Sequence, residues 1–122
     1  MSFSETLKRI VDCVEGGAGA VILGIDGISI ERYNQEAGSG LDLELIATEL
    51  SALLSRSMHT ASDTGLGDLR EMMFATDVMT FLLRPITPEY FLLFGINPGG
   101  NIGRARFELR KAQLALEAEF AI

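Results

Sequence analysis

The stretch from Ala20 to Tyr33, with the sequence AVILGIDGISIERY, decides the fold of this chain. Its first half, up to Ile25, is apolar at nearly every position, which is typical of a strand that is covered on both faces. Its second half, from Ile28, mostly alternates apolar and polar residues, as a strand near an edge does. Asp26-Gly27 between the halves is a strong signal for a two-residue hairpin. The stretch therefore predicts a central strand that turns back into a strand nearer the edge of a sheet.

Three more strands are predicted in the second half of the chain. A tight Thr76-Asp77 turn separates residues 69–75 from residues 78–84, and Tyr90–Ile96 is apolar on both faces, like the first strand. The two doubly apolar strands are both central only if they are neighbours. This requirement predicts a five-stranded, mostly antiparallel sheet with the strand order 2-1-5-4-3. The strand at 69–75 then lies at an edge, where its unpaired backbone groups are open to another chain.

Apolar residues at helical spacing predict three helices. The first covers residues 4–15, where Ser2 and Glu5 have the form of a capping box; the second covers 42–61, and Asn101 caps the third. Because the central strands need cover on both faces, helices must lie on both sides of the sheet. The expected fold is α/β (α+β), a single domain over residues 1–122 with the element order αββαβββα. Residues 34–40 have the composition of a mobile surface loop.

Composition excludes several classes of function. The chain has 122 residues and a formal net charge of −7, which opposes the basic footprint of nucleic-acid binding. With one cysteine and one histidine, it cannot form a disulfide or a Cys/His zinc cluster within itself. The apolar runs are too short for a membrane helix, and the N-terminus lacks the pattern of a secretory signal. We expect a cytoplasmic protein without metal or cofactor.

No residue or motif indicates catalysis. His59 lies near a helix end without a positioned acid or nucleophile, and Cys13, beside the buried stripe of its helix, is expected to act as a small hydrophobe. The glycine-rich stretches at 16–19 and 99–103 match neither phosphate-loop pattern and are interpreted as turns and caps. The basic residues Arg104, Arg106, Arg110 and Lys111, partly neutralised by Glu108, favour a solvated helical face over a docking patch for an acidic partner.

The opening hairpin, Gly19-Ala20-Val21-Ile22-Leu23 followed by Asp26-Gly27-Ile28-Ser29-Ile30, resembles that of roadblock (dynein light chain) domains. The long second helix and the segment from Asn101 to Arg110, with the sequence NIGRARFELR, are similar to that family's second and third helices. The likeness extends over nearly the whole chain. It implies a roadblock/profilin-like fold and a homodimer or heterodimer in which second helices pack together and third strands pair into one continuous sheet.

The implied dimer agrees with two features of the sequence itself, the edge strand at 69–75 and apolar residues that fall opposite the buried stripe of the second helix. Those off-stripe residues are Leu41, Leu45 and Ala52, although scattered surface leucines explain them equally well. The candidate dimer-interface residues are Leu45, Ala52, Leu69, Glu71 and Met73.

The resemblance also implies partners, because prokaryotic relatives act on small Ras-like GTPases as activating or scaffolding subunits. The family offers no catalytic motif to transfer, and Arg84 and Arg104 are conceivable arginine donors to a GTPase that their spacing does not single out. The expected function is a non-catalytic module that regulates or scaffolds such a GTPase. The alternatives are a structural scaffold dimer without effect on a GTPase and a small-molecule sensor; an enzyme is disfavoured.

Overall fold

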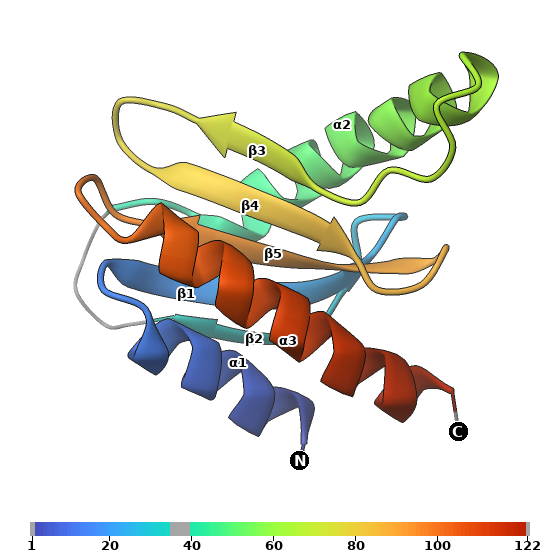
Figure 1. Ribbon diagram of the computed structural model, residues 1–122. Helices are drawn as coiled ribbons and strands as arrows, with labels where there is room; N and C mark the ends of the chain where they lie inside the picture. Colours follow the sequence, from blue (N-terminus) through green and yellow to red (C-terminus); the bar gives the residue numbers. More distant parts are fainter. Residues whose placement is uncertain (1, 35–39, 122) are drawn as a thin grey trace.

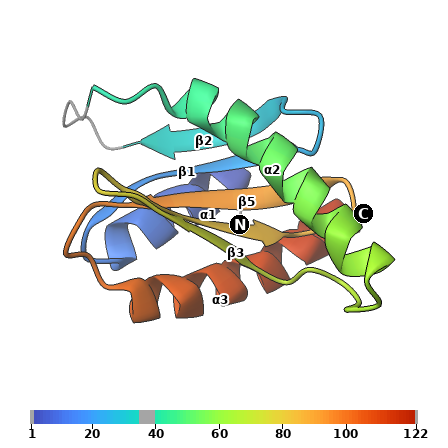
Figure 2. The ribbon, with the colours of Figure 1, turned by 90° about the horizontal axis from the view of Figure 1, so that it is seen from above.

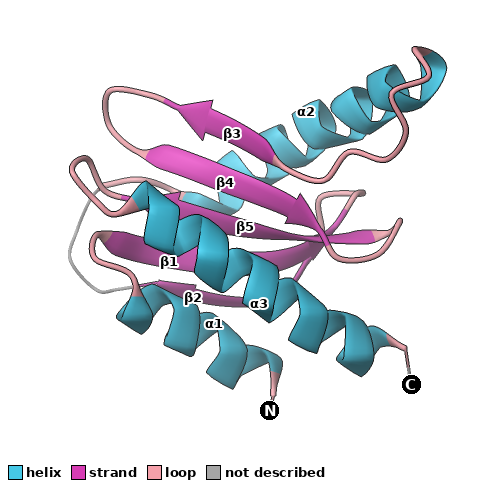
Figure 3. Cartoon of the chain, viewed as in Figure 1, coloured by secondary structure: helices cyan, strands magenta, loops and turns pink. Residues whose placement is uncertain are grey.

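The computed structural model describes residues 2–34 and 40–121, which form three helices and five strands (Figures 1 and 3). In chain order the elements are α1 (Phe3–Cys13), β1 (Gly17–Gly24), β2 (Ser29–Asn34), α2 (Leu43–Asp63), β3 (Met72–Ala75), β4 (Thr80–Pro85), β5 (Tyr90–Ile96) and α3 (Ile102–Phe120). The predicted element order is confirmed. Residues 35–39, within the loop expected at 34–40, lie outside the described residues.

The sheet has the strand order β2-β1-β5-β4-β3, and each neighbouring pair of strands is antiparallel. The predicted order is therefore confirmed, with β1 and β5 in the interior and β3 at an edge. In the β1–β2 hairpin, the Gly24 N–H donates to the Ile28 carbonyl, and Asp26 Oδ1 accepts from the Ile28 N–H. Gly27 adopts a φ of 89°, which favours glycine and explains why the Asp-Gly pair marks this turn.

Two apolar cores lie on opposite faces of the sheet. On one face α1 and α3 pack through Leu7, Ile10 and Leu109 against strand residues such as Leu82 and Phe94. On the other face α2 packs through Leu50 and Leu54 against a second set of strand residues. Figure 2 shows α2 on the side of the sheet opposite to α1 and α3. The predicted placement of helices on both faces is confirmed, and no described helix is both long and apolar enough to cross a bilayer.

Side-chain caps fix where the helices begin. Ser2 Oγ accepts from the Glu5 N–H, so Ser2 caps α1 as predicted, but Glu5 Oε1 accepts from the Ser2 hydroxyl and not from the Ser2 N–H as in a complete capping box. Asp42 accepts from the Leu45 N–H at the start of α2, and Asn101 accepts from the Arg104 N–H at the start of α3. Each cap satisfies one of the N–H groups that a helix leaves open at its N-terminus.

The third strand is shorter than the sequence predicts, because β3 begins at Met72 rather than at residue 69. Continuing the ladder would place Arg70 opposite Pro85, which has no N–H to donate.

The turn after β3 is also longer than the expected Thr76-Asp77 pair. Thr76 closes it from both sides, since its N–H and Oγ1 donate to the Met79 carbonyl and its Oγ1 accepts from the Met79 N–H.

Three side chains differ from the sequence-based expectations. Cys13 is exposed at the end of α1 instead of acting as a buried hydrophobe. Leu53 has the helical spacing of the buried apolar residues of the second helix and is predicted to be buried with them, but it is 44% exposed. Glu108, expected on a solvated face, is buried between α1 and α3, where Arg9 lies 3.4 Å and Arg104 3.6 Å from its carboxylate oxygens. Two nearby guanidinium groups make this burial of a charge tolerable.

Candidate interaction surface

An apolar surface extends over α2 and the edge strand β3. Leu45 and Leu53 on α2 are 58% and 44% exposed, and Phe74, whose side chain lies on the α2 face of β3, is 40% exposed; Met73, which pairs with Leu82, is 49% exposed on the opposite face of the strand. The hydroxyl of Ser57 on α2 lies 3.5 Å from the sulfur of Met72 on β3, so the two elements are in contact at this edge. We call the exposed side of α2 together with the open edge of β3 the α2–β3 surface.

The open edge of β3 offers hydrogen-bonding groups at alternate residues. Hydrogen-bonded and non-hydrogen-bonded pairs alternate along an antiparallel ladder. The Thr76 N–H donates to the Met79 carbonyl, and the register pairs Phe74 with Phe81, so the N–H and carbonyl of Phe74 point toward β4. The backbone groups of Met73 and Ala75 therefore point away from the sheet. These two residues present the donors and acceptors that another strand could use.

The outward side of α2 has a small residue, Ala52, between two side chains of opposite charge, Glu49 and Arg56. Leu45, Glu49, Ala52 and Arg56 are exposed and follow one another at spacings of three and four residues, which places them on one side of the helix. Glu49 precedes Ala52 by three residues, and Arg56 follows it by four. Neither charge has an ion-pair partner among residues 2–34 and 40–121, so both are available to an external partner.

The five candidate interface residues do not all belong to this surface. Leu45 and Ala52 are exposed on α2, and Met73 is exposed on β3. Leu69 precedes β3 and packs against the core beneath α2. Glu71 also precedes β3, and its carboxylate pairs with Arg106 at 2.7 Å and with Arg84 at 3.8 Å within its own chain. The structure thus brings Leu45, Ala52 and Met73 to the solvent and keeps Leu69 and Glu71 occupied by internal contacts.

The residues considered for chemistry lie on different elements, with His59 on α2, Arg84 on β4 and Arg104 on α3. His59 is exposed on α2, and no group of three His, Cys, Asp or Glu side chains among the described residues could hold a metal ion. The Arg84 side chain is only 11% exposed, and burial lowers the pKa of its guanidinium. Its contacts to Glu71 and Gln113 hold it in place, so it is poorly suited to reach into another protein. Arg104 is exposed beside Glu108.

The sequence interpretation did not include Glu49, Leu53, Arg56 or Phe74 in the interface. Leu53 was not included because its helical spacing groups it with the buried apolar residues of α2, although it lies at the margin of that group. In the structure the Phe74 side chain lies on the face of β3 that α2 covers, because Phe74 pairs with Phe81. The opposite charges of Glu49 and Arg56 were present in the sequence as a readable signal, at helical spacing around Ala52.

Several solved structures have the same fold as this chain. Myxococcus xanthus MglC is 29% identical, with a TM-score of 0.71 and coverage of 98% of this chain and 99% of that chain. A Roadblock/LC7 domain from Streptomyces avermitilis is 15% identical, with a TM-score of 0.85 and full coverage, 100%, of both chains. An MglB with a tetrameric arrangement is 17% identical, with a TM-score of 0.84 and coverage of 97% and 88%. No protein-family model and no curated protein matches the sequence.

Proposed function

Because the chain is a roadblock-type domain, we propose that it acts as a non-catalytic, dimeric interaction module that regulates or scaffolds a small Ras-like GTPase. The observation that carries the proposal is the α2–β3 surface, which joins an open strand edge to an exposed helix side with apolar residues and with two charges that form no ion pair within the part of the chain that the structure describes. The similar MglB with a tetrameric arrangement supports self-association. The GTPase partner rests on the resemblance to the roadblock family.

The proposed dimer pairs β3 of one copy antiparallel with β3 of the second copy. The outward backbone groups belong to odd-numbered residues, so the two-fold axis passes through a like pair, either Met73 with Met73 or Phe74 with Phe74. An axis perpendicular to the sheet keeps α2 of both copies on the same face and makes the two helices antiparallel. The dimer then buries the exposed Leu45 and Leu53 between two helices.

Charge complementarity supports a second copy as the occupant of this surface. In two antiparallel α2 helices that cross near Ala52, Glu49 of each copy lies opposite Arg56 of the other. The two copies thus form two equivalent ion pairs around a small residue that allows close approach. A parallel arrangement would place like charges together, so the pattern specifies direction as well as contact.

A charge-exchange experiment tests this dimer. Glu49→Arg and Arg56→Glu each replace two attractive pairs by two repulsive ones, which should weaken the dimer by about 1–2 kcal/mol, or about tenfold in Kd. The double variant Glu49→Arg/Arg56→Glu recreates both pairs with reversed sign and should restore the wild-type Kd. Lys111→Glu on α3 is the control, since it changes the net charge as Arg56→Glu does, outside this surface. A double variant that is weaker than both single variants would reject the antiparallel helix pair.

The GTPase proposal has its own experiment. Ras-like GTPases from the same genome are loaded with GDP or with a non-hydrolysable GTP analogue, and binding to the wild-type protein is measured by calorimetry. Hydrolysis is then followed with and without the protein. A regulator prefers one nucleotide state and changes the hydrolysis rate, whereas a scaffold binds without changing it. If none of these GTPases binds in either state, the GTPase part of the proposal is wrong, and the dimer is tested separately by the charge exchange.

A further inference from the structure

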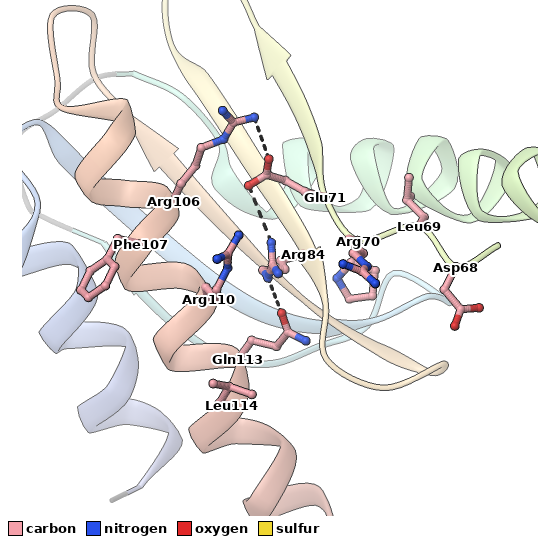
Figure 4. A pocket seen from close by; sticks show the side chains of 11 residues that line it. Asp68, Leu69, Arg70, Glu71, Arg84, Arg106, Phe107, Arg110, Gln113 and Leu114 are labelled. Carbon is pink, nitrogen blue, oxygen red and sulfur yellow. Dashed lines mark hydrogen bonds and ion pairs between the residues drawn. The ribbon is translucent and has the colours of Figure 1, made fainter. Parts of the chain in front are cut away.

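A groove of about 930 Å³ lies between the segment that leads into β3 and the helix α3. Figure 4 shows the side chains of this segment, of β4 and of α3 that line it. Four of the lining residues are arginines, namely Arg70, Arg84, Arg106 and Arg110. The lining of the groove includes no residue of α2, and its Arg70 and Glu71 directly precede β3.

The arginines of the groove are only partly neutralised. Glu71 pairs with Arg106 at 2.7 Å and with Arg84 at 3.8 Å, whereas neither Arg70 nor Arg110 has an ion pair among the residues that the structure describes. Asp68 is the second acidic residue of the lining and lies away from the cluster of arginines in Figure 4. Four arginines against two carboxylates leave the lining with a formal charge of +2, in a chain whose net charge is −7.

Arg84 forms the rigid base of this groove. Its Nε donates to Gln113 Oε1 on α3, and its side chain is 11% exposed. Burial is the main cause of the lowered pKa of Arg84, and the negative charge of Glu71 is the largest effect that opposes it; the positive charges of Arg110 and Arg70 add smaller effects in the same direction as burial. The guanidinium groups therefore lie close enough to repel one another. A bound anion would relieve this repulsion.

The rim of the groove indicates which anion fits. Phe107 and Leu114 on α3 also line it and are 61% and 63% exposed, so large apolar side chains face water on the α3 side of the groove; Figure 4 shows Phe107 across α3 from Arg84 and Glu71. A peptide with carboxylates interleaved with apolar side chains would use both kinds of surface. A compact phosphate would use only the charges and would meet the Glu71 carboxylate between Arg84 and Arg106.

We propose that this groove is a docking site for an acidic, apolar peptide segment of a partner protein, with Arg70 and Arg110 binding its carboxylates and Phe107 and Leu114 contacting its apolar side chains. Arg84 and Arg106 are positioning residues. Arg84 contacts Gln113 and Glu71, and Arg106 contacts Glu71, so together they hold the segment that leads into β3 against α3. The site adds a second interaction surface, on the face of the sheet opposite to α2.

The test uses fluorescein-labelled peptides of about twelve residues in which Leu and Phe alternate with Glu, or with Gln in the matched control peptide. Fluorescence anisotropy should show saturable binding of the Glu peptide and at least about tenfold weaker binding of the Gln peptide. Arg70→Glu and Arg110→Glu should each weaken the Glu peptide by about tenfold or more. Lys111→Glu should change its Kd by less than about twofold, although it makes the same change in charge beside Arg110.

Amide chemical shifts locate the binding independently of affinity. The proposal expects shifts on adding the Glu peptide at residues 68–71 and 106–114, and circular dichroism confirms that each variant is folded. Equal losses for Arg110→Glu and Lys111→Glu would overturn the proposal in favour of non-specific attraction. Absence of peptide binding, with inorganic phosphate alone shifting these amides, would overturn it in favour of a small-anion site.

Discussion

Replacing Met73 by proline tests the role of the open strand edge without disturbing the fold. The Met73 N–H points away from β4, so proline removes no hydrogen bond within the chain. The preceding residue, Met72, is already in a strand, which is the conformation that a residue before proline favours. Met73→Pro should therefore leave the monomer folded while it blocks the pairing of β3 with a second copy.

The expected magnitude follows from the symmetry of the dimer. The substitution occurs once in each copy, so two backbone donors are lost at the pairing of the two β3 strands. At about 0.5–1.5 kcal/mol for each net hydrogen bond, the loss is about 1–3 kcal/mol, and the proline ring adds a steric cost. The dissociation constant of the dimer should rise by about tenfold to about a hundredfold.

The assay is sedimentation velocity over a dilution series, and two control variants separate the causes. Met73→Ala removes a side chain that is 49% exposed but keeps the N–H, so it should weaken the dimer less than Met73→Pro does. Phe74→Pro removes an N–H that points toward β4 and should lower the thermal stability of the monomer itself. If Met73→Pro dimerises as tightly as wild type, the pairing of β3 edges is refuted.

Three further predictions concern the cores and caps and are measured by chemical denaturation. Phe94→Ala, in the core between the sheet and α1 and α3, should lower the free energy of unfolding by about 3–5 kcal/mol, and a loss below about 1 kcal/mol would contradict its burial. Arg9→Met should lower the free energy of unfolding by about 1–3 kcal/mol because it removes a partner of the buried Glu108 carboxylate. The double variant Arg9→Met/Glu108→Leu should recover most of this loss, because it removes the buried charge as well. An additive loss in the double variant would refute the energetic coupling of Arg9 and Glu108. Asn101→Ala should cost about 1 kcal/mol through the lost cap of α3, whereas Asn101→Asp should keep it.

The topology of the sheet could be predicted from the sequence because two apolar strands constrain it. Ala20–Ile25 and Tyr90–Ile96 both need cover on two faces, which makes them neighbours and fixes the order of the other strands. The helix starts were also predictable, since Ser2 and Asn101 act within three residues of themselves. These features depend on local chemistry and on a simple rule of burial.

The limits of β3 and the burial of Glu108 could not be predicted, because both depend on contacts distant in sequence. The ladder of β3 stops where Arg70 would face Pro85, and this pairing follows from the register of β3 with β4. Glu108 is buried because Arg9, which is 99 residues away along the chain, lies against it. The arginine groove has the same origin, since it combines Arg70, Arg84 and Arg110 from three separate parts of the chain.

The central claim is that two copies of this chain associate through the α2–β3 surface, and the solution mass tests it most directly. Light scattering coupled to size-exclusion chromatography is measured over a dilution series of the wild-type protein. A dimer formed through this surface gives the wild-type protein a mass of twice 13.2 kDa that persists on dilution, whereas the mass of Met73→Pro falls toward 13.2 kDa at the lower concentrations. A wild-type mass of 13.2 kDa at every concentration would contradict the account.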